Sequence, residues 1–160
     1  MGNPPFIGAR LMTVEQKAET NALWPRGKAG LLDYCAGWYA KAAAYLADTE
    51  QASFAFVTTN SITQGQQVAA LFSALLEDGW TVLFAHRTFT WTSEAANAAA
   101  VHCVIVGFTR DTTVRPRLFD YDRPSSAPVE RSGVRTINAY LVDGANVLVT
   151  KHSRPLSPEL

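Results

Sequence analysis

The residues with the clearest chemical potential stand at the start of the chain, in the run Gly2-Asn3-Pro4-Pro5-Phe6. Two adjacent prolines fix two successive φ angles and supply no N–H donors, so this loop is stiff and offers bare carbonyl oxygens. The Asn3 side-chain oxygen and the Pro4 carbonyl can each accept one hydrogen of a planar –NH2 group, while the Phe6 ring stacks on its flat face. Both hydrogen bonds draw the nitrogen toward tetrahedral geometry, which frees its lone pair to attack an electrophilic methyl group. The alternative is a proline-rich N-terminal tail.

Three apolar runs predict the strands that position this loop. Residues 52–59 (ASFAFVTT) form a nearly unbroken apolar run, typical of a strand buried on both faces, and residues 80–86 and 101–108 have the same character. A predicted helix over 64–77 connects the first two runs, so we expect them to be parallel. The last two are separated by a predicted loop at 87–94 and an alanine-rich stretch, which favours an antiparallel hairpin.

Sequence patterns also predict where the helices begin. Thr13 and Gln16 have the spacing of a capping box, which predicts a helix from there to about Trp24. Apolar residues at helical spacing predict a second helix over 31–47. Two overlapping capping boxes then predict the start of the helix at 64–77; they pair Ser61 with Gln64 and Thr63 with Gln66.

Composition limits the class of protein. The chain has 160 residues, of which 48% are hydrophobic, enough for one core; its 14 basic and 14 acidic residues give no sign of a polyanionic partner. Cys35 and Cys103 lie in apolar runs and are expected to be buried free thiols of a cytoplasmic protein. We expect no membrane span and no metal site, and we interpret His102 as a core histidine.

The chain changes character beyond Arg110, where apolar residues become sparser and prolines appear at 116, 124 and 128. We therefore interpret residues 125–160 as an exit linker. Within it, Asp143-Gly144 lies between two short β-prone runs over 137–150, a pattern compatible with a small hairpin.

In this order, the segments resemble the catalytic domain of amino-group DNA methyltransferases, in particular the MmeI-like branch of type II restriction–modification enzymes. The segments that carry the resemblance are GNPPF at 2–6, LDYCAGWYAKAA at 32–43, FVTTNSITQGQQV at 56–68, FAHRTFTWTSEA at 84–95, AVHCVIVGF at 100–108 and LVDGANVLVTKHSRPL at 141–156. The likeness therefore spans nearly the whole chain.

The resemblance implies an α/β fold of the class I S-adenosylmethionine-dependent methyltransferases, a Rossmann-like doubly wound sheet with an antiparallel last strand. It also implies that residues 1–124 are only the C-terminal half of the catalytic domain, truncated before the first strands, and that 125–160 lead to an absent target-recognition domain. No G-x-G occurs in the sequence. The main S-adenosylmethionine-binding motifs are thus expected in a missing N-terminal half, so this chain alone should be inactive.

By the same resemblance, Asn3, Pro4 and Phe6 are the expected catalytic residues, acting on an adenine flipped out of double-stranded DNA. Phe89 and Trp91 are candidates for the second stacking surface, although both rings could instead fill core. Arg87 is a candidate for DNA contact. Thr59, Asn60 and Ser61 follow a strand and precede a helix; we favour helix capping for them, and Thr59 and Asn60 stay candidates for DNA contact.

Two other functional classes stay open. Similar loops occur in RNA and protein-glutamine methyltransferases, so this chain could be a fragment of one of those enzymes. It could also be a non-catalytic remnant or interaction module. If strands are missing, the exposed sheet edge predicts self-association of the fragment.

Overall fold

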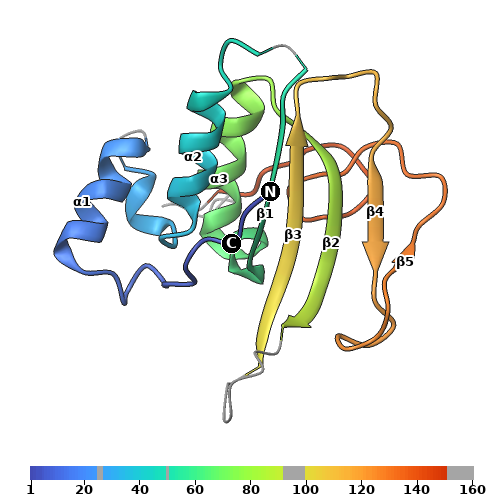
Figure 1. Ribbon diagram of the computed structural model, residues 1–160, viewed down its shortest axis with the longest axis horizontal. Helices are drawn as coiled ribbons and strands as arrows, with labels where there is room; N and C mark the ends of the chain where they lie inside the picture. The colour runs from blue at the N-terminus through green and yellow to red at the C-terminus, as the bar shows by residue number, and fades with distance from the viewer. Residues whose placement is uncertain (25–26, 50, 92–99, 151–160) are drawn as a thin grey trace, which may run out of the picture.

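The computed structural model describes residues 1–24, 27–49, 51–91 and 100–150. Its strands form one sheet in the order β1-β3-β2-β4-β5 (Figure 1). Their bounds are Ser53–Thr59 for β1, Thr81–Trp91 for β2, Val101–Thr109 for β3, Arg117–Asp120 for β4 and Val129–Glu130 for β5. Strand β3 is antiparallel to both β1 and β2, and β4 is parallel to β2. The carboxyl ends of β1, β2 and β4 therefore share one edge of the sheet, the lower edge in Figure 1.

The helices lie together on one side of the sheet (Figure 1). They are α1 (Val14–Leu23), α2 (Ala36–Tyr45) and α3 (Gly65–Glu77), with short 3-10 turns η1 (Ala29–Leu31) and η2 (Asn60–Thr63). The predicted capping box of α1 is confirmed, because the Thr13 hydroxyl accepts from the Gln16 N–H and the Gln16 side chain accepts from the Thr13 N–H.

The core forms where α2 and α3 cover the face of the sheet on the helix side. Tyr39 of α2 is fully buried, and its ring lies 5.0 Å from that of Phe56 in β1 and 5.9 Å from that of Phe108 in β3. The Tyr39 hydroxyl is 3.4 Å from the Thr58 hydroxyl, so the polar atom buried with the ring has a partner. Aromatic residues thus fix the distance between helix and sheet.

The three predicted strands and their directions are confirmed. Strands β1, β2 and β3 overlap the apolar runs at 52–59, 80–86 and 101–108, and β2 and β3 pair as the expected antiparallel hairpin. Strands β1 and β2 are parallel in direction, with β3 between them. The tip of the hairpin, including the alanine-rich stretch, lies outside the described residues.

Two predictions about helix starts are wrong, because side chains bond elsewhere. The second helix begins at Ala36 rather than at Leu31: Leu32 is extended, and the Asp33 N–H donates to the Gln67 side chain. Neither proposed capping box opens α3, whose N-cap Gln64 makes no side-chain capping bond. The Thr63 hydroxyl instead donates to the Asn60 carbonyl within η2.

The sheet extends further than the sequence predicted. Strand β2 continues through the supposed loop to Trp91, and Thr90 donates its N–H to the Pro124 carbonyl at 2.7 Å. Strand β4 was not predicted; it pairs in parallel with β2 and places Leu118, 1% exposed, in the core. Its other side chains are polar or half-exposed, which explains its weak apolar signal.

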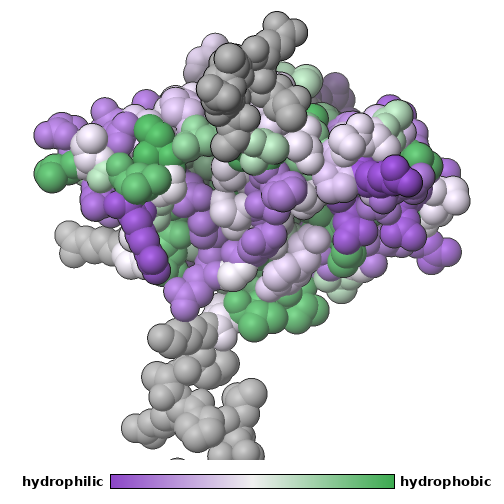
Figure 2. Space-filling view, turned by 90° about the horizontal axis from the view of Figure 1, so that it is seen from below, coloured by the Kyte–Doolittle hydropathy of each residue, from purple (hydrophilic) through white to green (hydrophobic). Residues whose placement is uncertain are grey.

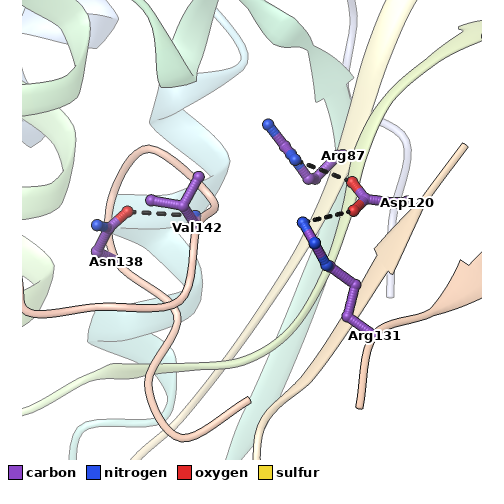
Figure 3. Close-up of polar contacts among 5 residues, drawn as sticks. All are labelled: Arg87, Asp120, Arg131, Asn138 and Val142. Carbon is purple, nitrogen blue, oxygen red and sulfur yellow. Dashed lines mark hydrogen bonds and ion pairs between the residues drawn. The ribbon is translucent and has the colours of Figure 1, made fainter. Parts of the chain in front are cut away.

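The segment after β5 packs against the domain. Ile137, Ala139 and Leu141 are buried in the core cluster. The predicted hairpin turn at Asp143-Gly144 is wrong, since Asp143 itself forms the single antiparallel bridge with Ile137. The turn lies between them, where the Asn138 side-chain oxygen accepts from the N–H of Val142 at 3.3 Å (Figure 3).

Gly107 in β3 tests the packing of the sheet face opposite to Phe108. A Cβ at this position would overlap the Phe84 ring. We expect Gly107→Ala to lower the free energy of unfolding by about 1–3 kcal/mol, because an overpacked site must displace a ring or a strand. Chemical denaturation measures this change. Gly30→Ala is the matched control, since its Cβ would have no neighbour within 4 Å; equal stability of the two variants would contradict the close approach.

Candidate functional site

The Asn3–Phe6 loop begins directly beside β1. The Gly2 N–H donates to the Ala55 carbonyl and the Gly2 carbonyl accepts from the Val57 N–H, both at 3.0 Å, so that Gly2 forms a parallel bridge to β1. The chain then continues in the direction of β1, toward the edge where β1, β2 and β4 end. In doubly wound sheets this is the edge at which ligands bind.

Within this loop the two candidate acceptors are unused by the rest of the described chain. Asn3 and Pro5 are exposed, Pro4 is buried and Phe6 is half-buried. Among the described residues, no hydrogen bond involves the Asn3 side chain or the Pro4 carbonyl, whereas the Pro5 carbonyl accepts from the Ile7 N–H at 3.2 Å.

The Asp33 carboxylate joins this loop to the turn after β1. One oxygen accepts from the Ala9 N–H at 2.8 Å, and the other accepts from the Ser61 hydroxyl at 2.6 Å. The adjacent Tyr34 N–H donates to the Ile7 carbonyl at 2.9 Å. Asp33 is only 9% exposed, so these contacts are protected from water and hold the segment after Phe6 in place. Sequence reasoning missed Asp33, because its partners are 24 and 28 residues away.

Two of the candidate capping residues, Thr59 and Ser61, take part in this same network. The Thr59 and Ser61 hydroxyls lie 2.6 Å apart, and Ser61 continues to Asp33. The favoured capping interpretation is thus wrong for Thr59, Asn60 and Ser61: none of them caps α3. Asn60 is half-buried at the end of β1, and DNA contact by Thr59 or Asn60 stays a prediction.

Phe89 lies two strands away from Thr59 in the same row of the sheet. Thr59 pairs with Cys103, and Cys103 pairs with Phe89. Neighbouring strands are about 4.8 Å apart, so β1 and β2 are separated by about 10 Å, and the chain at Gly2 is one strand spacing further. The span suits a planar base with a contact on each face. The sheet thus brings Asn3–Phe6 and Phe89 to one edge.

Phe89 belongs to a row of aromatic side chains. Its ring stacks against that of Tyr121 at 5.3 Å and lies 6.3 Å from that of Trp91, which is 39% exposed. The Tyr121 hydroxyl is 2.9 Å from His86 Nδ1. Tyr121 was not predicted, since it follows the unrecognised strand β4. The alternative that Phe89 and Trp91 fill the core does not hold, because neither belongs to the buried cluster.

Arg87 lies in an ion-pair cluster. Its guanidinium is 3.0 Å from one Asp120 oxygen, and Arg131 is 3.0 Å from the other (Figure 3). Arg87 and Arg131 are 40% and 56% exposed. Two guanidiniums share one carboxylate, so the cluster keeps a net positive charge next to the edge that carries Phe89. A phosphate could compete for these donors.

The edge as a whole mixes polar and apolar surface. Figure 2 views the molecule from below, onto this edge, and shows polar and apolar side chains next to each other.

Among the described residues, no cluster of His, Cys, Asp and Glu could hold a metal ion. No helix among them is long and apolar enough to cross a membrane. The prediction that His102 lies in the core is wrong, because His102 is exposed near the start of β3.

Among the described residues, no glycine-rich turn connects a strand to the N-terminus of a helix. A site for S-adenosylmethionine in a doubly wound fold needs a turn of this kind. In the described chain, β1 leads into η2 and α3 through polar residues whose hydroxyls bond to one another or to Asp33. This edge offers oxygens that can accept hydrogen bonds from an amine and aromatic rings that can stack on a planar group.

Asp33→Asn tests the network around the loop. The amide would present a donor to the Ala9 N–H or to the Ser61 hydroxyl, leaving one buried group unpaired. We expect the free energy of unfolding to fall by about 1–3 kcal/mol, measured by chemical denaturation. Asp48→Asn, at an exposed position, should change the free energy of unfolding little. A similar result for both variants would show that the Asp33 contacts do not stabilise the fold.

His86 predicts a pH dependence of stability. Burial, and then the charge of Arg117, lower the pKa of His86. The unfolded chain, with the usual value of about 6.5, then binds a proton before the folded chain does, so stability should fall as pH drops below about 6.5. Thermal unfolding at pH 7.5 and 5.5 measures this. His86→Gln should reduce the pH dependence; an unchanged pH dependence in this variant would contradict the assignment.

Comparison with known proteins shows the family and the fold. A sequence model of the family described as "MmeI, DNA-methyltransferase domain" matches residues 1–120. DNA methyltransferase A of Bacillus subtilis (strain 168) is 39% identical over 158 residues, which cover 98% of this chain and 17% of that protein. A solved structure of the Type IIL restriction-modification enzyme MmeI in complex with DNA is 42% identical, with a TM-score of 0.92, over 98% of this chain and 21% of the other.

The chain thus spans about a fifth of the length of these relatives. The match confirms the predicted α/β fold, and the sheet described above is the class I methyltransferase-like fold with its antiparallel strand at β3. The chain belongs to the MmeI DNA-methyltransferase domain family.

Proposed function

We propose that this chain forms the part of a restriction–modification DNA methyltransferase that binds and activates the target base, and that the target is the exocyclic amino group of adenine. The observation that carries the proposal is the Asn3–Phe6 loop: two acceptor oxygens without a donor among the described residues lie at the carboxyl edge, in a chain that belongs to a DNA-methyltransferase family. Adenine, rather than cytosine, is favoured by the likeness to the MmeI-like branch.

In this proposal the loop acts through two preorganised hydrogen bonds. The Asn3 side-chain oxygen and the Pro4 carbonyl each accept one amino hydrogen, so the nitrogen becomes more tetrahedral and more nucleophilic. The prolines and the Asp33 contacts keep the oxygens in place, and little reorganisation is needed during the reaction. S-adenosylmethionine supplies the methyl group when bound. Its site would be formed by segments other than those described here.

The amino group of a paired base is inaccessible, so the base must leave the helix. We propose that Phe6 stacks on one face of the flipped base and Phe89, next to Trp91, on the other. The half-buried state of Phe6 and Phe89 supports this role, because each ring is held by neighbours and still has free surface. Arg87 would contact a DNA phosphate next to the base.

The remaining expectations about partners are also proposals. Among the described residues, the outer edge of β1 is paired only through Gly2. We propose that further strands of a longer protein pair along this lateral side of β1. By itself, the chain is proposed to self-associate along the same side. The expected exit-linker role of residues 125–160 and a cytoplasmic location belong to the same proposal; both cysteines are free and buried, which agrees with a reducing compartment.

Asn3→Ala tests the proposed chemistry. The suitable protein is a chimera in which this chain replaces its matched segment in the MmeI enzyme, since that match covers 98% of the chain. We expect a fall in the methylation rate of about a hundredfold or more, because one preorganised acceptor is lost, while DNA affinity stays largely unchanged. Asn21→Ala, at an exposed position of α1, is the control. Near-normal turnover of Asn3→Ala would refute the assignment.

Phe6→Ala tests base stacking separately. Loss of one stacking ring costs about 1–3 kcal/mol, so the rate on paired DNA should fall. On DNA with a mismatch at the target base, part of the rate should return, because less unpairing energy must be supplied. Methylation of both substrates by the same chimera measures this difference. An equal loss on the two substrates would argue against stacking.

A further inference from the structure

We propose that Tyr121 is a positioning residue for Phe89: its ring covers one face of Phe89, and its hydroxyl is held by His86. This inference rests on the proposed stacking of Phe89 on the target base and names the residues that set the orientation of that ring. The two rings are 5.3 Å apart with an interplanar angle of 26°, and the Tyr121 oxygen is 2.9 Å from His86 Nδ1.

An irregularity in β2 makes this arrangement possible. His86 pairs with Ile105 and Phe89 pairs with Cys103, so three steps along β2 correspond to two along β3. In a regular strand, residues three apart point to opposite faces. The extra residue of this bulge returns Phe89 to the face that carries His86. Both side chains can therefore contact the same tyrosine.

His86 is itself held firmly. Its ring stacks on Phe119 with centroids 4.4 Å apart and an interplanar angle of 8°, and the Arg117 guanidinium lies 5.0 Å from the centroid of Phe119. The parallel pairing of β2 with β4 places His86 opposite Phe119. The hydroxyl of Tyr121 thus bonds to an imidazole that is fixed by a stack and by strand pairing.

The backbone on either side of Tyr121 is also fixed. Strand β4 ends at Asp120, whose carboxylate bonds to Arg87 and Arg131. Three residues after Tyr121, the Pro124 carbonyl accepts from the Thr90 N–H, next to Phe89, at 2.7 Å. These contacts fasten Tyr121 to the part of β2 that carries Phe89. The contact between the two rings is therefore built by the fold.

The contact with Tyr121 would reduce the free energy that is lost when the Phe89 ring is fixed upon binding a base. A half-exposed ring at a strand end samples several rotamers, and fixing it upon binding costs free energy. With Tyr121 against one face, Phe89 keeps its orientation and has its other face for a planar base. Tyr121 touches Phe89 and not the base, so it acts through Phe89.

The test uses four variants of the chimera described above: Tyr121→Leu, Tyr121→Phe, Phe89→Ala and the double variant Tyr121→Leu/Phe89→Ala. The measured quantities are kcat and KM for methylation of paired and of mismatched DNA. We expect Tyr121→Leu to lower the rate on paired DNA by about threefold to tenfold, the value of a typical aromatic pair, with partial recovery on mismatched DNA. Tyr121→Phe keeps the ring and should retain most of the rate.

The double variant separates positioning from a general structural role. If Tyr121 acts through Phe89, adding Tyr121→Leu to Phe89→Ala should lower the rate no further. Tyr140→Leu is the matched control, because Tyr140 is also half-buried and its hydroxyl accepts a hydrogen bond from the Val149 N–H; it should leave the ratio of paired to mismatched rates unchanged.

The outcomes distinguish this inference from the proposed function. Additive losses in the double variant, or an unchanged rate in Tyr121→Leu while Phe89→Ala is impaired, would overturn the positioning role and leave the stacking role of Phe89 intact. An unchanged rate in Phe89→Ala would overturn the stacking role itself, and with it the inference. The proposed chemistry at Asn3 would survive either result.

Discussion

The antiparallel placement of β3 between β1 and β2 determines where the site can form. Because β3 runs opposite to both neighbours, β1 and β2 point the same way and end at the same edge. Thr59 and Phe89 are 30 residues apart in the sequence, but both pair with Cys103 and therefore lie in one row of the sheet. The Gly2 bridge adds the Asn3–Phe6 loop to this edge. Reversing one strand would separate the acceptor oxygens from the aromatic row.

The parts of the fold that the sequence predicted are those set by local composition. Strands β1 and β3 are continuous apolar runs, and α1 begins at a capping box whose two partners are three residues apart. Strand β4 escaped prediction because its stability comes from pairing with β2 rather than from its own side chains, of which only Leu118 is buried.

The same distinction applies to the candidate site. Asn3 and Pro4 could be proposed from the sequence because the chemistry predicted for them depends on adjacent residues: a stiff loop and two oxygens. Asp33 and Tyr121 could not, since the significance of each comes from contacts 24 to 35 positions away. The supposed caps Ser61 and Thr63 show the converse error: a local pattern predicted caps, but their hydroxyls bond to Asp33 and to the Asn60 carbonyl.

The two sides of the site are held by different kinds of force, and this matches what each must do. The acceptor side relies on proline geometry and on the charge-assisted hydrogen bonds of Asp33, which are short and directional. The aromatic side relies on stacked rings, whose contact energy changes gradually with small displacements. A reacting nitrogen needs the first kind of precision. In the proposed function, a base that enters from the double helix tolerates the second, and stiffness would be concentrated where the bond forms.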